Sequence, residues 1–245
     1  MIGCALGNPA EMTRPQADVS TSLLGIDHIA LRVVDPDGLA AFLCDHLGMQ
    51  RKETPDGLSL LGSPDAGTRL LLSKAEAPSD PGALERVVLR VSDLERALSL
   101  LPDKLDIEHA EPGLAVFEGP EGLGLGLTSV LGGGVDYDID HVVLRAMNPD
   151  ETTIALAELG FVPAGGALHV ADKQVRVLSG MRSAGGPELL SHIGVLVQSV
   201  DAVADQAMRG GLVPDRLTLA PNRLGIYVRG PERLRVEYAE RASMS

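Results

Sequence analysis

Four stretches of the chain share one pattern of hydrophobic and polar positions. Each begins with a run of aliphatic and β-branched residues, becomes polar at Asp or Pro-Asp, and continues with apolar residues at helical spacing. The apolar run predicts a β-strand, and the polar break predicts the cap of a short helix. The four runs begin at Ile26, Leu84, Ile139 and Leu190, and the expected helices cover 37–48, 94–101, 150–160 and 200–211.

Each expected helix is followed by short apolar runs that Gly and Pro interrupt, which is typical of strands joined by tight turns. The second and fourth stretches both contain Gly-Pro-Glu, at 119–121 and 230–232, so we expect a strand–turn–strand hairpin at the same place in both. Each stretch therefore predicts a βαβββ unit. Their near-constant spacing marks these units as an internal repeat. The third residues of the four runs are His28, Arg86, His141 and His192, at intervals of 58, 55 and 51 residues.

Composition excludes several classes of partner. Of 245 residues, 44% are hydrophobic and 22% are charged, which is typical of a globular protein. Aromatic residues make up 2% with no Trp, and the net charge is −13. A nucleic-acid partner is not expected, because it requires stacking side chains or a basic face.

Cysteine usage and hydropathy indicate a cytoplasmic protein. Cys4 and Cys44 are too few for a disulfide framework. No apolar run has the length of a membrane span, so no membrane partner is expected. The N-terminal residues lack the basic start of a signal peptide, and we interpret 1–24 as a flexible arm.

The four βαβββ units resemble the vicinal oxygen chelate superfamily, which includes glyoxalase I, extradiol dioxygenases and bleomycin-resistance proteins. The resemblance covers roughly 25–241 and is closest to the type I extradiol ring-cleavage dioxygenases, which have four such modules. It implies an α+β fold with four tandem βαβββ modules paired into two curved-sheet, barrel-like halves. We expect these halves at 25–130 and 139–245, joined by a Gly-rich linker at 131–138.

A metal site is expected in the C-terminal half. His141 and His192 occupy equivalent first-strand positions, and Glu237 lies in a last strand where Val236 and Tyr238 face the other way. Two imidazoles and one carboxylate are the ligand set of non-haem Fe(II) oxygenases. We therefore predict that His141, His192 and Glu237 bind Fe(II), although Mn(II) or another divalent metal also suits this set.

No metal is expected in the N-terminal half. In the second module, Gly126 takes the position of Glu237, and Arg86 takes that of the histidine. The last strand of the first module, within 68–75, contains no carboxylate, and neither does that of the third, within 175–180. His28 is therefore interpreted as a core histidine without a metal partner.

The resemblance also implies catalytic residues. The family's Phe-Tyr, Thr-Pro and Glu-Tyr pairs correspond to Ile226-Tyr227, Gly230-Pro231 and Glu237-Tyr238, which places Tyr227 beside the substrate. Histidines of the family are replaced at two further places, a pair by Gln174-Val175 and a single one near Thr218. His169 is a candidate replacement as base; the alternative is a histidine that lines the pocket or the surface.

These features predict an Fe(II)-dependent extradiol-type dioxygenase that cleaves a small aromatic vicinal diol with dioxygen and forms a homo-oligomer. One alternative is a metal-dependent lyase, isomerase or atypical oxygenase of the same superfamily, which the missing histidines favour. The other alternative is a resistance protein that binds a metabolite or drug.

Overall fold

The computed structural model describes residues 23–54, 56–130, 135–181, 187–220 and 223–240, with the backbone alone at 218–220 and 223. All four predicted βαβββ modules are present in this part of the chain. Most of the expected arm and residues 131–134 of the expected linker lie outside it. The remaining linker residues, 135–138, form a turn.

The elements follow one order in every module. The first contains β1 (Leu23–Val33), α1 (Pro36–Leu47), β2 (Gln50–Glu53), β3 (Ser59–Gly62) and β4 (Arg69–Lys74). The second contains β5 (Leu84–Val91), α2 (Leu94–Ser99), β6 (Glu108–Glu111), β7 (Leu114–Glu118), η1 (Pro120–Gly122) and β8 (Gly124–Ser129). The third contains β9 (Ile139–Ala146), α3 (Pro149–Glu158), β10 (Val162–Ala164), β11 (Ala167–Val170) and β12 (Lys173–Ser179). The fourth contains β13 (Leu190–Val197), α4 (Val200–Arg209), β14 (Asp215–Ala220), β15 (Arg223–Arg229), η2 (Pro231–Arg233) and β16 (Arg235–Glu240).

The helices begin where the sequence predicts because each has a side-chain cap. An Asp, Asn or Ser precedes the first turn and accepts a hydrogen bond from a backbone N–H three residues later, which satisfies a donor that the helix leaves unpaired. These capping residues are Asp35, Asp93, Asn148 and Ser199.

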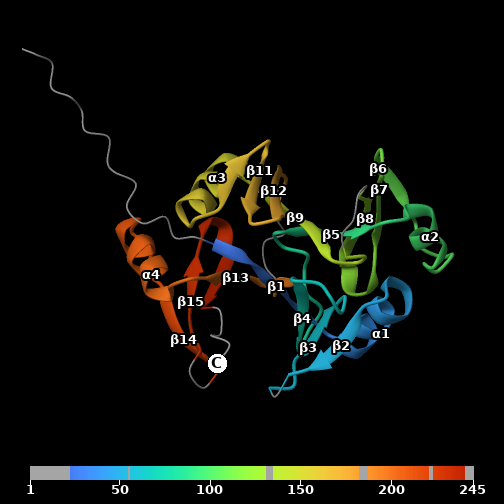
Figure 1. Ribbon diagram of the computed structural model, residues 1–245, viewed down its shortest axis with the longest axis horizontal. Helices are drawn as coiled ribbons and strands as arrows, with labels where there is room; N and C mark the ends of the chain where they lie inside the picture. Colours follow the sequence, from blue (N-terminus) through green and yellow to red (C-terminus); the bar gives the residue numbers. More distant parts are fainter. Residues whose placement is uncertain (1–22, 55, 131–134, 182–186, 221–222, 241–245) are drawn as a thin grey trace, which may run out of the picture.

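The modules pair differently from the expected halves. One eight-stranded sheet has the order β14-β15-β16-β13-β1-β4-β3-β2, and the other has the order β10-β11-β12-β9-β5-β8-β7-β6. The first module thus shares a sheet with the fourth, and the second shares a sheet with the third. Figure 1 shows this exchange, with β1 (blue) beside β13 (orange) and β5 beside β9. The expected division into 25–130 and 139–245 is therefore wrong as a description of the sheets.

Modules that are neighbours in sequence contact each other through the Gly-Pro-Glu turns instead. Glu121 adopts a positive φ, and its carboxylate accepts hydrogen bonds from the backbone N–H groups of Val34 and Asp35 at the start of α1. Glu232 does the same for Met147 and Asn148 at the start of α3. A carboxylate at a helix N-terminus is favourable because unpaired N–H groups and the helix dipole face it. A turn of the second module thus caps α1 of the first, and a turn of the fourth caps α3 of the third, across the two sheets.

Alternation along the strands separates a core face from a free face in the sheet that contains β1. Ile29, Leu31 and Val33 are fully buried in the core, which also includes apolar residues of α1 and α4. The side chains of His28 and Arg32 point to the opposite face by the two-residue period of a strand. The helices therefore leave one face of this sheet available for a site. No helix in the described ranges has both the length and the apolar character to cross a membrane.

Candidate metal centre

Three buried side chains converge on the free face of this sheet: His28 on β1, His192 on β13 and Glu237 on β16. Nε2 of His28 lies 2.9 Å from Nε2 of His192, which in turn lies 3.4 Å from Oε2 of Glu237. One potential ligand atom from each residue lies within 4.8 Å of the other two. Each residue is at most 7% exposed. A buried carboxylate beside two imidazoles is costly unless a partner compensates it, so this arrangement favours a cation.

Strand register explains the convergence. His28 lies opposite Gly194 on β13, and Gly194 lies opposite Glu237 on β16, so the three positions form one row across the sheet. His192 is two residues before Gly194 and shares its face. Gly194 leaves room for the ring of His28, because a Cβ at this position would overlap the imidazole atoms. The sequence therefore places a glycine where any side chain would separate the two outer ligands.

Each histidine has a neighbour that fixes its ring. The pairing of β1 with β13 contains irregularities at Asp27 and Ser191, the residues directly before His28 and His192. Bulges of this kind redirect side chains. Nδ1 of His28 lies 3.0 Å from Oδ2 of Asp27, and Nδ1 of His192 lies 3.2 Å from Oγ of Ser191. Contacts at Nδ1 leave both Nε2 atoms facing the centre, as metal-binding histidines require.

The electrostatics keep His192 neutral. Burial is the main cause that lowers the pKa of His192 to about 3, and the charges of His28, Arg235 and Arg32 lower it further. A neutral imidazole is the form that binds a metal ion, so His192 needs no deprotonation at neutral pH.

Tyr227 lies beside the centre, opposite Glu237 in the register of β15 and β16. Its hydroxyl is 3.5 Å from Nδ1 of His192, and the two rings meet edge to face with centroids 5.0 Å apart. Burial and the carboxylate of Glu237 raise the pKa of Tyr227, so the hydroxyl stays protonated at neutral pH. The guanidinium of Arg235 covers the ring, with Cζ 4.9 Å from its centroid. The structure thus places Tyr227 beside His192 and Glu237, and its expected role at a bound substrate stays a prediction.

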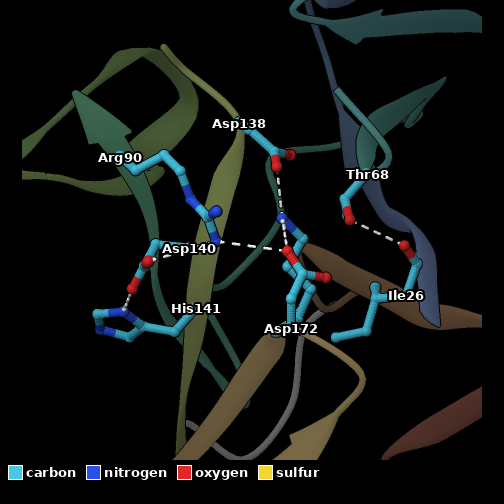
Figure 2. A network of polar contacts seen from close by, with 8 residues as sticks. Ile26, Thr68, Arg90, Asp138, Asp140, His141 and Asp172 are labelled. Atoms are coloured by element: carbon cyan, nitrogen blue, oxygen red, sulfur yellow. Dashed lines mark hydrogen bonds and ion pairs between the residues drawn. The ribbon is translucent and has the colours of Figure 1, made fainter. Parts of the chain in front are cut away.

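The structure does not bring His141 to this centre. His141 lies on β9 in the other sheet, where Nδ1 is 2.8 Å from Oδ2 of Asp140. Figure 2 shows this pair joined to Arg90, which lies 3.5 Å from Asp140 and 3.7 Å from Asp172. The hydrogen bond to His141 is the largest cause that lowers the pKa of Asp140. The expected grouping of His141 with His192 and Glu237 is thus corrected: pairing of the first and fourth modules supplies His28 instead.

His169 also lies in the other sheet. It is on β11, opposite Gln174, which is itself opposite His141 on β9. Its Nε2 lies 3.2 Å from the carbonyl oxygen of Ala164. His169 is therefore not placed to act as a base beside His192 and Glu237. Val175, the other residue at the family's histidine pair, is fully buried in the core.

The sequence could not identify His28 because the repeat makes the histidines equivalent. Ile-Asp-His occurs at both 26–28 and 139–141, and the connections between modules, 75–83, 130–138 and 180–189, have nearly equal lengths. Neither feature says which modules share a sheet. Only the long-range pairing of β1 with β13 separates His28 from His141.

The donor atoms fit a divalent transition metal. Two imidazole nitrogens and one carboxylate oxygen suit Fe(II), Mn(II) and Zn(II), whereas a site for Ca²⁺ or Mg²⁺ would consist of oxygen atoms. Three protein ligands leave coordination positions for water or substrate, in contrast to the four ligands of a structural zinc site.

Comparison with known proteins relates the N-terminal part of the chain to one superfamily. Residues 25–101 match the family model of the Glyoxalase/Bleomycin resistance protein/Dioxygenase superfamily. The resemblance to this superfamily that the sequence indicated is confirmed. No curated protein matches the sequence significantly.

Solved structures extend the similarity over the whole fold. A proposed dioxygenase from Bacillus subtilis is 17% identical with a TM-score of 0.70, and the match covers 90% of this chain and 86% of that one. Glyoxalase I from Zea mays is 15% identical with a TM-score of 0.67, covering 88% and 92%. The cppA protein from Streptococcus pneumoniae is 14% identical with a TM-score of 0.62, covering 90% and 99%. At these identities the similarity establishes the fold.

Proposed function

We propose that the protein is a non-haem Fe(II) enzyme that cleaves an aromatic vicinal diol with dioxygen, with His28, His192 and Glu237 as the metal ligands. The observation that carries the proposal is the convergence of two Nε2 atoms and one carboxylate oxygen in a buried centre. This ligand set, with open positions, is that of non-haem Fe(II) oxygenases. Mn(II) is the second candidate for the same ligands.

Residues around the centre support the binding of a substrate oxygen beside the metal ligands. When bound, Fe(II) would supply Lewis acidity and electrons for reaction with dioxygen. Tyr227 keeps its proton, because Glu237 and burial raise its pKa, and its hydroxyl can donate a hydrogen bond to a substrate oxygen beside the ligands. The contact between Asp27 and the imidazole of His28 holds this ring in place before substrate arrives.

A metal-dependent isomerase or lyase is the second candidate, and the positions of the other histidines favour it. His46 lies on α1, whereas His109, His141 and His169 lie on strands of the second sheet. Ring cleavage in the resembling dioxygenases employs a further histidine as acid and base. Tyr227 is the neighbour that would have to replace it, and a phenol with a raised pKa stays protonated at neutral pH, so it cannot accept a proton and gives one up reluctantly.

Anaerobic loading with Fe(II) tests the proposal. The protein is purified without metal, titrated with Fe(II), and mixed with 2,3-dihydroxybiphenyl or catechol while oxygen uptake and the yellow ring-cleavage product are followed. We expect both signals in the wild type and in His141→Ala, and neither in Glu237→Gln. Metal binding without oxygen uptake, together with activity in a glyoxalase or lyase assay, would favour the second candidate. Absence of metal binding would favour a metabolite-binding protein.

A further inference from the structure

We infer that the cavity next to the metal centre, lined by Arg32, Arg229, Arg233 and Arg235, binds an anionic group of the substrate, either a carboxylate or a phosphate. That the same substrate also reaches the metal rests on the proposed function, whereas the anion site is inferred from its own residues. The cavity has a volume of about 320 Å³. Leu190 and Ser191, next to the ligand His192, form part of its wall.

Three of these arginines, Arg32, Arg229 and Arg235, are on strands and lie on the same face of the sheet as the ligands. Arg32 follows His28 by four residues on β1, and Arg235 precedes Glu237 by two residues on β16. Both separations are even, so these side chains point to the side of the ligands. Arg229 follows Tyr227 by two residues on β15 and lies opposite Arg235. One molecule bound on this face can therefore contact both the metal ligands and the guanidinium groups.

The charges in this cavity are poorly compensated. The chain carries a net charge of −13, yet four arginines meet here, and Glu188 is the carboxylate that the same wall contributes. Among the ion pairs of the described residues, none includes Arg32, Arg233 or Arg235, and Arg229 has a distant one, 3.8 Å from Asp215. Nε of Arg235 is buried without a hydrogen-bond partner. Like charges held together, with an unpaired buried donor, favour an anion that satisfies them.

Guanidinium groups also define the chemistry of the ligand. A planar fork of N–H donors matches the two oxygens of a carboxylate or phosphate, and several arginines on one wall recognise such groups better than neutral ones. Arg235 connects the two parts of the site, because its guanidinium also covers the ring of Tyr227. The substrate class is thus an aromatic diol, or another metal-binding oxygen compound, that carries an acidic substituent.

The anion site can be tested without metal or turnover. Metal-free protein is titrated with phenylacetate and, separately, with phenyl phosphate by calorimetry. We expect at least one of the two to bind, with an affinity at least tenfold weaker in the Arg32→Gln/Arg235→Gln double variant. Arg216→Gln is the control. It removes an exposed arginine on β14 of the same sheet, which pairs with Asp201 of α4, and we expect this variant to bind the anions like the wild type. Stoichiometric metal binding by the double variant shows that its centre is still folded.

A second measurement links the anion site to the metal. Zn(II)-loaded protein is titrated with 3,4-dihydroxyphenylacetate and with its uncharged methyl ester, which share one diol ring. We expect the acid to bind at least tenfold more tightly than the ester in the wild type, and the two to bind alike in the double variant.

The outcomes separate the two proposals. If neither phenylacetate nor phenyl phosphate binds, or if both bind the double variant as tightly as the wild type, the anion site is refuted whatever the enzyme does. If acid and ester bind the wild type equally, the link between anion and substrate is refuted, while metal and diol binding are retained. If the Fe(II)-loaded wild type binds the anions but does not turn over the diols, the proposed function alone is refuted.

Discussion

The two sheets have equivalent strand orders, but their equivalent positions carry different chemistry. In the sheet of the first and fourth modules, the first strands contribute His28 and His192, and Glu237 lies opposite Gly194. In the other sheet the corresponding first-strand residues are Arg86 and His141, and Arg176 lies opposite Val143 at the place of Glu237.

That second set cannot hold a cation. It combines one imidazole with two guanidinium groups, and Gly126 and Arg176 replace the carboxylate. Its centre is filled by apolar side chains, since Val88, Val143 and Leu114 form a small buried cluster. Asp140 nevertheless fixes the ring of His141 as Asp27 fixes that of His28. The bulge that orients a histidine is thus common to both sheets, whereas the carboxylate that makes a metal centre is present in one.

The strongest test of this contrast compares the two Asp-His pairs directly. His28→Ala removes a ligand, and we expect the affinity for Fe(II) or Zn(II) to fall by about 1,000-fold, equivalent to about 4 kcal/mol. His141→Ala removes an imidazole from the other sheet and should leave affinity and stoichiometry unchanged. Calorimetry and metal analysis of both variants measure this. Loss of binding in His141→Ala with retention in His28→Ala would reverse the assignment of the two sheets.

Gly194 offers a test in which all three ligand residues are retained in the sequence. A Cβ at position 194 would overlap the ring of His28, so Gly194→Ala must displace this ligand. Overpacking of this kind costs about 1–3 kcal/mol, and we expect metal affinity to fall by about 100-fold. Gly25→Ala, on the same strand as His28 and with no atom within 4 Å of the new Cβ, is the matched control. Equal affinities of the two variants would mean that His28 does not contribute to binding.

Local sequence information was sufficient for the modules and insufficient for their pairing. Helix caps at Asp35, Asp93, Asn148 and Ser199 lie directly after the apolar runs, so element type and order could be predicted. His192 and Glu237 lie in one module, and adjacent strands of one module bring them together, so the proximity of these two candidate ligands was predictable.

The third ligand depends on contacts between distant parts of the chain. β1 and β13 are separated by about two thirds of the sequence, and their pairing is stabilised by buried residues on both strands. The Gly-Pro-Glu turns could be recognised as a repeat, but their role as caps for the helix of the preceding module requires the positions of Glu121 and Glu232 in space. The arginine cavity has the same origin, since it combines residues of β1, β15 and β16.

The residues that orient the two histidines give a smaller difference. Asp27→Asn weakens the hold on Nδ1 of His28, and changes at such positions reduce metal affinity about 10-fold to 100-fold. We expect about tenfold for this variant. Asp140→Asn makes the same change beside His141 and should leave metal affinity unchanged, while it lowers thermal stability because Arg90 loses part of its compensation. A drop in metal affinity in Asp140→Asn would indicate that the second sheet also contributes to the centre.

The smallest expected effect is a pH dependence of the metal-free protein that comes from the first sheet. The pKa of His192 falls to about 3 in the folded chain, mainly through burial, and a free histidine has a pKa of about 6.5. Between these values the unfolded chain takes up a proton that the folded chain does not. This contribution to stability is therefore present above about pH 6.5 and is lost progressively as the pH falls towards 3. Between pH 6.5 and 5.5 the loss is about 1 kcal/mol, measurable by urea denaturation in the presence of a chelator. His192→Gln should remove this part of the dependence, and His141→Gln should retain it. If both variants lose it equally, the difference in histidine environment between the two sheets is not the cause.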